Sequence, residues 1–231
     1  MEKYIYTARF IANTGKQYES EYRIRRKDGS YLWVHDVGRK AVSAEGQELI
    51  VSIVTDMSDQ VEYRHRLESE NGVDFLAKVY NRKGAKDCIK RQAKKYDHCM
   101  FMVMDLDNFK LVNDIYGHVT GDEMLQFIAG LLWDAFGEKG VVCRLGGDEF
   151  AVFLPDHGSL ETVEQRLRTI SEAYAAHAQE HCPDSGSSVS IGGVYGTSGA
   201  SLGIKYQKAD ANLYRVKNNT KGRSLITNFD E

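Results

Sequence analysis

The apolar and polar positions follow two different periods along the chain. Residues 19–55 alternate apolar and polar side chains between turn sequences, with Asp28-Gly29 in the first turn and residues 44–46 in the second. This alternation predicts a small antiparallel β segment whose strands are joined by tight turns. A sheet of so few strands has an apolar face, but it is too small to bury that face by itself.

Residues 58–72 are polar and rich in helix-forming side chains, which predicts an exposed linker helix able to pair with a copy of itself. The dipeptide Asn71-Gly72 interrupts this pattern, and we place a domain boundary there. The chain is thereby divided into a first domain at residues 1–57, the linker helix at 58–72 and a second domain at 73–231.

The second domain alternates strand and helix patterns. Residues 99–104 are an unbroken apolar run, as expected of a strand covered on both faces, and residues 121–136 carry apolar side chains at helical spacing. This mixed order predicts an α/β (α+β) fold around a central covered sheet. Further strands are expected at 141–145, 150–154, 187–194 and 224–227, and further helices at 84–95, 160–181 and 202–217.

The composition narrows the class of protein. The 231 residues are 42% hydrophobic and 27% charged, as in a globular chain, and a net charge of -3 provides no general basic field for a nucleic acid polymer. No apolar run approaches the ~18 residues of a membrane span, and the four cysteines form no C-x-x-C pair. We therefore expect a cytoplasmic chain with no membrane segment, while a longer parent protein would be free to carry an anchor upstream.

Two acidic residues directly follow the apolar run at 99–104. Asp105 and Asp107 are two positions apart, so they share one face of the strand if it continues that far. Ligands of α/β folds bind at such a sheet edge, and carboxylates there suit Mg²⁺. The alternative is that Asp105 caps the following helix, and this pair alone gives the two interpretations equal weight.

A second acidic group lies in a predicted hairpin. Gly146-Gly147 permit a tight turn close to a ligand, and Asp148 and Glu149 place acids between apolar strands. Such turns are common, so this hairpin becomes a candidate functional site only if the strand that ends at Asp105 lies beside it. The carboxylates would then repel one another unless a cation lies among them.

The start of the next helix offers groups for phosphate and base. Backbone N–H groups at a helix start bind anions, and Lys110 adds a positive charge. Asn113 and Asp122 carry groups that hydrogen-bond a purine edge. Taken singly, each of these residues is more often a helix cap or a solvated surface group.

Together these motifs resemble the GGDEF family of diguanylate cyclases over about residues 73–228. The resemblance implies a palm-like nucleotidyl-cyclase domain. It is carried, in the order of the family, by Asp105–Asp114, Tyr116–His118, Gly121-Asp122, Arg144–Phe150, Ser190–Gly192 and Ala209–Lys217.

For the reaction, the resemblance implies that Asp105, the carbonyl group of Leu106 and Asp148 bind Mg²⁺, for which Mn²⁺ would substitute. Glu149 would act as the general base, and Lys110 would complete the catalytic set. The 3′-hydroxyl group of one GTP would attack the α-phosphate of another, giving cyclic di-GMP and pyrophosphate. This chemistry requires a homodimer, paired through the linker helix and the cyclase domains.

For the substrate, the resemblance implies a GTP site. Asn113 and Asp122 would read guanine, and Lys217 with Lys221 or Arg223 would add positive charge at the triphosphate. The remaining phosphate contacts would come from Asn108, Phe109 and Lys110. The alternative from another class is a GTP-binding regulatory or interaction module with little or no turnover.

The sequence departs from the family at several positions. Gly137 and Gly140 stand where the Arg-x-x-Asp motif for product inhibition would fall, and Ala77-Lys78 replace a Thr-Gly pair in the opening motif. In front of this domain, residues 19–60 resemble the C-terminal strands of a PAS sensor domain. The ligand-pocket part of such a domain is not matched, so we expect no sensory cofactor.

The segment His177-Ala-Gln-Glu-His181 fits the H-x-x-E-H pattern of some zinc peptidases. It lies on a predicted amphipathic helix, where histidines near the C-terminus interact favourably with the helix dipole. We favour this helix-surface interpretation over a zinc site.

Overall fold

The computed structural model describes residues 17–27, 31–43, 46–60, 72–197 and 201–229. The chain divides into two compact units, Met1–Leu67 and Glu68–Glu231. Residues 58–60 are helical, as expected for the start of the linker helix, and its continuation at 61–71 lies outside the described residues.

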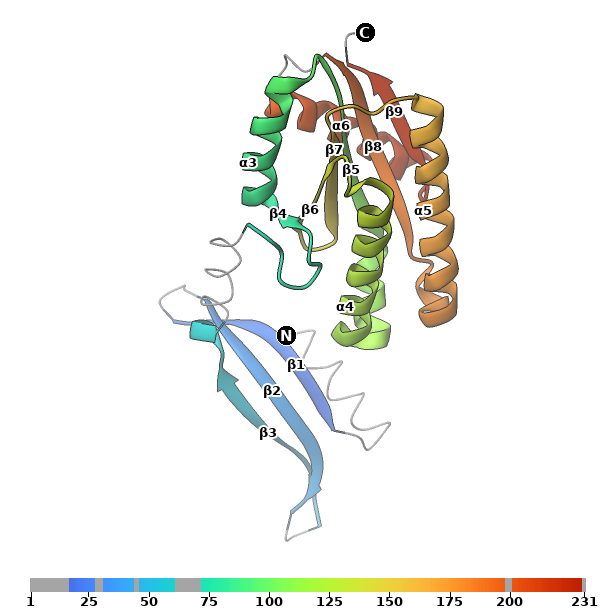
Figure 1. Cartoon of the computed structure of the whole chain (residues 1–231). Coiled ribbons are helices and arrows are strands. Elements are labelled where there is room, and N and C mark those ends of the chain that lie inside the picture. The colour runs from blue at the N-terminus through green and yellow to red at the C-terminus, as the bar shows by residue number, and fades with distance from the viewer. Residues whose placement is uncertain (1–16, 28–30, 44–45, 61–71, 198–200, 230–231) are drawn as a thin grey trace. The chain divides into compact units, whose positions relative to one another are not determined.

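The first unit contains a 3-stranded antiparallel sheet (Figure 1). The predicted antiparallel strands are confirmed, whereas Asp28-Gly29 of the first turn and residues 44–45 of the second lie outside the described residues. Asp36 in the second strand is buried. A buried carboxylate needs hydrogen-bond donors, and here the hydroxyl groups of Tyr18 and Tyr22 donate to it at 3.0 and 2.9 Å. In order, the strands are β1 (Tyr18–Arg25), β2 (Tyr31–Val42) and β3 (Glu48–Asp56).

The second unit is built on a 6-stranded sheet with the order β4-β6-β7-β5-β8-β9. The strand β5 (His98–Asp107) lies in the middle, antiparallel to β7 (Glu149–Leu154) and β8 (Ser188–Thr197). Residues 99–104 are all buried, which confirms a strand covered on both faces. The other strands are β4 (Tyr80–Asn81), β6 (Val141–Gly146) and β9 (Ser224–Asn228).

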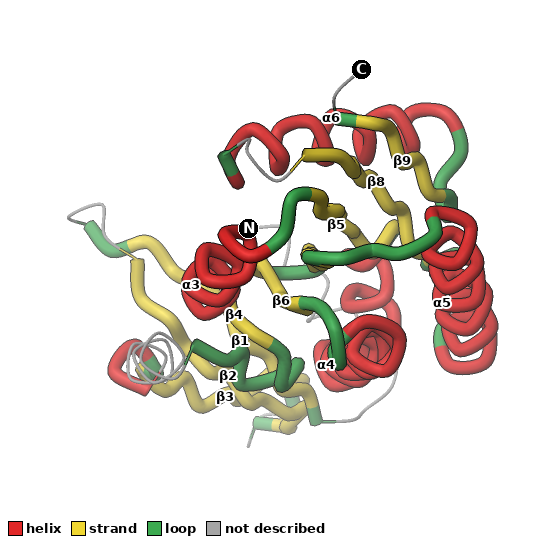
Figure 2. Tube along the Cα trace, turned by 45° about the horizontal axis from the view of Figure 1, so that its top comes forward, coloured by secondary structure: helices red, strands yellow, loops and turns green. Residues whose placement is uncertain are grey.

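Helices cover both faces of this sheet (Figure 2). One core, which includes Leu125 and Leu167, packs α4 (Phe109–Phe136) and α5 (Leu160–His181) against the sheet. The other core, which includes Ile89 and Leu213, packs α3 (Arg82–Gln92) and α6 (Leu202–Asn219) against the opposite face. Apolar burial on both faces stabilises the predicted α/β fold.

The extent of α4 differs from the prediction, which has a helix start near Lys110 but a helical pattern only over residues 121–136. The helix begins at Phe109 and bends at Gly117, whose φ of 86° and ψ of 166° are not helical. Glycine adopts this positive φ without the steric cost that a side chain would bring. The strand β4 was also missed, since two residues carry no period that a pattern can reveal.

Candidate active site

The sheet brings the end of β5 next to the hairpin between β6 and β7. Asp105 lies opposite Glu149 in the register of β5 and β7. The backbone N–H group of Leu106 donates to the carbonyl oxygen of Asp148 at 3.3 Å. The strand that ends at Asp105 therefore lies beside the hairpin with Asp148 and Glu149, which is the arrangement that the sequence argument required.

Asp105 carries the strongest charge interaction at this edge. Its Oδ1 atom lies 2.5 Å from the Nζ atom of Lys217 in the last turn of α6, and its side chain is 15% exposed. Burial raises the pKa of Asp105 above its ordinary value, the Lys217 ammonium group opposes this shift, and the carboxylates of Asp148 and Asp107 add to it. A positive charge among these carboxylates is what stabilises their ionised form.

Two glycines shape the hairpin. Gly146 and Gly147 have φ values of 147° and 56°, and no atom lies within 4 Å of a Cβ placed on either. The guanidinium group of Arg144 holds the turn from below, because Nε and Nη2 donate to the carbonyl oxygen of Gly147 at 2.9 and 2.7 Å. Asp148 and Glu149 thus follow a turn whose backbone is held by Arg144.

The groups at this edge fit a hard divalent cation. Asp105 and Asp148 bring carboxylate oxygens, and Leu106 between them adds a backbone carbonyl group. Among the described residues, no cluster of three or more His, Cys, Asp or Glu side chains could hold a metal ion by itself. Two carboxylates and one carbonyl group suit Mg²⁺, because this ion takes few protein ligands and completes its coordination shell with water and substrate phosphates.

Asn108 forms the turn from β5 into α4. It adopts the left-handed conformation, with φ 59° and ψ 20°, which asparagine tolerates better than most residues. Its Nδ2 atom donates to the carbonyl oxygens of Ser185 and Gly186 at 3.3 and 3.0 Å, and its Oδ1 atom accepts from Lys221 at 3.1 Å. One side chain therefore ties the start of α4 to two other loops.

The first residues of α4 match the predicted anion site in position. Phe109 is buried in the core, whereas the side chain of Lys110 is exposed. Backbone N–H groups at the start of a helix have no partner within it and favour anions. The open helix start and an ammonium group therefore lie together after β5.

Asn113 and Asp122 lie on α4 on either side of the bend at Gly117. A Cβ atom on Gly121 would lie 2.0 Å from Oδ1 of Asn113, so the amide group of Asn113 lies against the backbone beside Asp122. The structure thus brings together the two residues that were predicted to contact a purine. Glycine at position 121 is required for this approach.

Asp107 differs from the expectation that it joins Asp105 as a carboxylate for metal. It is 2% exposed, and its Oδ2 atom accepts hydrogen bonds from the hydroxyl groups of Ser188 and Ser190, both at 2.7 Å. The N–H group of Gly222 also donates to this atom, at 3.2 Å. The sequence could not reveal this role, because all three donors are distant in the chain.

The other predicted cations belong to the last turn of α6, which carries Lys217, and to the segment after it, which carries Lys221 and Arg223. Lys217 contacts Asp105 and Lys221 contacts Asn108, so both reach the end of β5. Arg223 is placed through its backbone, whose carbonyl oxygen accepts from the N–H group of Ile191 at 2.9 Å, and its side chain is exposed.

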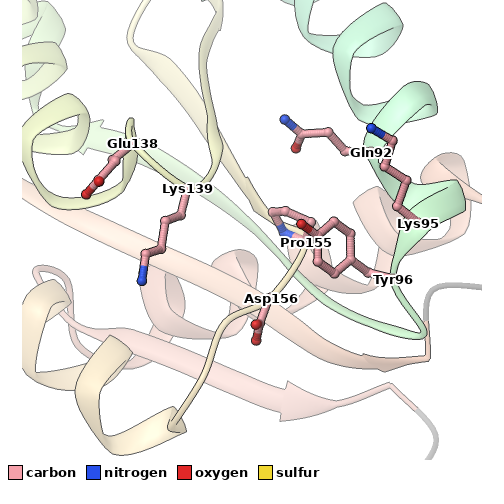
Figure 3. A pocket seen from close by; sticks show the side chains of 7 residues that line it. All are labelled: Gln92, Lys95, Tyr96, Glu138, Lys139, Pro155 and Asp156. Atoms are coloured by element: carbon pink, nitrogen blue, oxygen red, sulfur yellow. The ribbon is translucent and has the colours of Figure 1, made fainter.

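A cavity of about 490 Å³ lies at the opposite end of the sheet, near the start of β5 and the end of β7 (Figure 3). None of the predicted site residues contributes to it. Its lining consists of Gln92, Lys95, Tyr96, Glu138, Lys139, Pro155 and Asp156. The cavity is therefore separate from the end of β5, where Asp105 and Lys217 are in contact and Leu106 bonds Asp148.

The histidines of the H-x-x-E-H pattern lie on α5. The ring of His177 stacks on Phe127 of α4 at a centroid distance of 3.8 Å, and the ring of His181 lies tilted against it at 4.0 Å. This packing of rings between two helices agrees with the helix-surface interpretation.

Comparison with known proteins covers both units. Residues 71–223 match the family described as "Diguanylate cyclase, GGDEF domain", and residues 2–54 match the PAS fold. The probable diguanylate cyclase DgcF of Escherichia coli K12 is 31% identical over 164 residues, which cover 68% of this chain and 52% of that protein. The diguanylate cyclase DgcM of the same strain is 30% identical over 185 residues, covering 78% of this chain and 44% of that protein. The chain thus spans about half the length of these relatives.

A solved structure supports the same assignment. The GGDEF domain of DgcB from Caulobacter crescentus, crystallised in complex with c-di-GMP, aligns with a TM-score of 0.61 and 26% identity. The alignment covers 67% of this chain and 95% of that domain. In the described ranges, no helix is both long and apolar enough to cross a membrane. With its acidic hairpin, its sheet edge and its match over residues 71–223, the chain belongs to the GGDEF family of diguanylate cyclases.

Proposed function

We propose that the chain condenses two molecules of GTP into cyclic di-GMP, with release of pyrophosphate, and that the reaction depends on Mg²⁺. The observation that carries this proposal is the convergence of Asp105, Asp148 and Lys217 at one sheet edge. Carboxylates that need a cation, beside an ammonium group, suit a metal-bound triphosphate better than any uncharged ligand.

The proposed metal ligands are Asp105, the carbonyl group of Leu106 and Asp148, with Mn²⁺ as a substitute ion. When bound, the metal supplies positive charge that polarises the phosphoryl oxygens and favours the ionised 3′-hydroxyl group. Glu149 accepts the proton of that hydroxyl group as general base. Lys110 and the backbone at Asn108 and Phe109 hold the β- and γ-phosphates, helped by Lys217, Lys221 and Arg223.

Guanine is proposed to bind at Asn113 and Asp122. The carboxylate of Asp122 accepts from the ring N–H and amino groups of guanine, which adenine cannot provide in the same pattern. The amide group of Asn113 donates to an acceptor on the same base. This pairing gives the site its preference for GTP over ATP.

Each cyclase domain holds one GTP, so the reaction requires two domains face to face in an isologous dimer. We propose that residues 58–72 form the linker helix that pairs the two chains, between the PAS segment at 1–57 and the cyclase domain at 73–231. GTP is a cytoplasmic substrate, and we place the domain in the cytoplasm.

The second candidate is a GTP-binding regulatory module with little turnover. It is favoured by Ala77-Lys78 in the opening motif, where the family has a Thr-Gly pair. Both candidates bind GTP, and only the first forms product.

The experiment incubates the purified chain with GTP and Mg²⁺ and separates the nucleotides. We expect cyclic di-GMP, at a rate per chain that rises with protein concentration. Asp148→Ala removes a proposed ligand and should abolish turnover, whereas Asp134→Asn changes an exposed acid on α4 and serves as the matched control. GTP binding without product at any protein concentration would favour the regulatory module.

A further inference from the structure

We infer that the buried carboxylate of Asp107 is a positioning residue for the triphosphate, because it anchors the loop of residues 220–223 that carries Lys221. This inference rests on the proposed function, in which Lys221 lies at the phosphates. The end of β5 would then have two roles. Asp105 is a proposed metal ligand, and Asp107 holds the loop of residues 220–223.

The anchor is built from three segments. Ser188 and Ser190 on β8 donate their hydroxyl hydrogens to Oδ2 of Asp107, both at 2.7 Å. The backbone N–H group of Gly222 donates to the same atom and to the hydroxyl oxygen of Ser190, both at 3.2 Å. Hydrogen bonds to an ionised acceptor are about twice as strong as neutral ones, so this carboxylate is an effective attachment point.

The loop approaches β8 closely at Gly222. Gly222 has a φ of 73°, and a Cβ atom on it would lie 3.2 Å from Cβ and 3.3 Å from Oγ of Ser188. Glycine is needed there both for the positive φ and for the close approach. A side chain at position 222 would therefore push the loop away from β8.

Neighbouring residues extend the anchor to the cation. Asp107 binds Gly222, and Asn108, the next residue, accepts a hydrogen bond from the ammonium group of Lys221 at 3.1 Å. Two consecutive residues at the end of β5 therefore hold two consecutive residues of the loop. The ammonium group is kept at the start of α4, where the unpaired N–H groups of the helix also favour phosphate.

The cost of this arrangement argues against a purely structural role. The Oδ1 atom of Asp107 is buried and finds no hydrogen-bond partner among the described residues. A buried charge that is incompletely paired lowers stability, and apolar replacements of such groups are often neutral or stabilising. Placement of the loop gives this carboxylate a task that an apolar residue cannot perform.

The test measures the affinity of the full chain for GTP and for GMP in the presence of Mg²⁺. For Asp107→Ala we expect the affinity for GTP to fall about tenfold, which is the factor for one charge-assisted hydrogen bond. The affinity for GMP should stay unchanged, because the guanine contacts are untouched. Ser187→Ala is the matched control, since that hydroxyl group donates to the backbone carbonyl oxygen of Asp107 and not to its carboxylate.

A second variant covers the case in which Asp107→Ala does not fold. Gly222→Ala leaves the buried carboxylate in place and displaces only the loop, so it should cause the same selective loss for GTP. An equal fall for both nucleotides, or no fall in either variant, would overturn the inference. A wild-type chain that does not prefer GTP over GMP would instead refute the proposed function.

Discussion

Arg144 links Asp74, near the start of the cyclase domain, to the hairpin that carries Asp148. Its Nη1 atom lies 3.2 Å from Oδ1 of Asp74, and both side chains are 14% exposed. Its Nε and Nη2 atoms bond the carbonyl oxygen of Gly147, while Oδ1 of Asp74 also accepts from the N–H group of Ala77. The segment at 74–77 is therefore connected to the hairpin through largely buried side chains.

The first prediction concerns this link. Arg144→Lys keeps the charge but cannot donate from two guanidinium nitrogens to the carbonyl oxygen of Gly147, so Asp148 should lose its fixed position. We expect the rate of cyclic di-GMP formation to fall roughly 100-fold, as small misplacements of catalytic groups do, while GTP affinity changes little. Steady-state kinetics measures both quantities.

Asp74→Asn is the companion variant for this prediction. It removes one charge from the link yet retains an oxygen that can accept from Ala77, and it leaves the bonds between Arg144 and Gly147 in place. A smaller loss of rate is expected. Equal losses of rate in the two variants would show that the ion pair with Asp74, and not the hydrogen bonds to Gly147, positions the hairpin.

The second prediction concerns the proposed guanine site. In Gly121→Ala, the new Cβ atom would lie 2.0 Å from Oδ1 of Asn113, so the amide group must move away. Loss of one hydrogen bond to guanine should raise KM for GTP about tenfold. Gly130→Ala on the same helix is the control, because no atom lies within 4 Å of its Cβ position. An unchanged KM in Gly121→Ala would exclude Asn113 from the base contact.

The sequence predicted those parts of the site that are encoded locally. The apolar run at 99–104 identified β5, and the position of Asp105 directly after it placed the acid at the sheet edge. The Gly-Gly turn likewise identified the hairpin with Asp148. Each of these signals lies within a few neighbouring residues, so period and turn chemistry were sufficient.

The parts that were missed depend on pairing between distant segments. The spacing of Asp105 and Asp107 makes both of them candidates for Mg²⁺, and nothing near Asp107 in the sequence indicates that Ser188, Ser190 and Gly222 donate to it instead. The contact between Arg144 and Asp74 spans seventy positions and was equally invisible. Hydrophobic patterns report which face of an element is buried, not which polar groups meet there.

The third prediction is weak product inhibition. Gly137 and Gly140 occupy the positions of the Arg-x-x-Asp motif, and the backbone there is tightly packed. A Cβ atom on Gly140 would lie 2.6 Å from Cδ2 of Leu154, and one on Gly137 would lie 2.6 Å from Cδ2 of Trp133. Cyclic di-GMP at micromolar levels should therefore lower the initial rate little. Strong noncompetitive inhibition would contradict the assignment of these positions.

The fourth prediction concerns the four cysteines, which are free and buried. Burial raises the pKa of Cys143 to about 12, and it also raises the pKa of Cys182. Since the thiolate is the reactive form, a thiol reagent at pH 8 should label the native chain slowly. In denaturant all four thiols should react at once. Rapid labelling of the native chain would show that one of the sites opens readily.

The fifth prediction follows from the stacked rings on α4 and α5. The pKa of His177 is lowered from its ordinary value of 6.5 by burial and by the neighbouring His181, and the carboxylates of Glu180 and Glu123 oppose the shift only in part. The folded chain thus releases this proton more readily than the unfolded chain does. The contribution of His177 to the free energy of unfolding should therefore be fully present above pH 6.5. It should be lost as the pH falls toward the lowered pKa.

The comparison that isolates this effect uses the urea midpoints of the wild-type chain and of His177→Gln at pH 7.5 and 5.5. The variant lacks the titrating ring, so its midpoint should fall less between the two pH values than that of the wild type. His181→Gln removes the neighbouring ring that helps to lower the pKa of His177 and should give an intermediate pH dependence, because burial still lowers that pKa. Identical slopes in all three chains would mean that the stacked histidines titrate as they do in the unfolded state. The acid sensitivity of the domain would then have to come from its carboxylates.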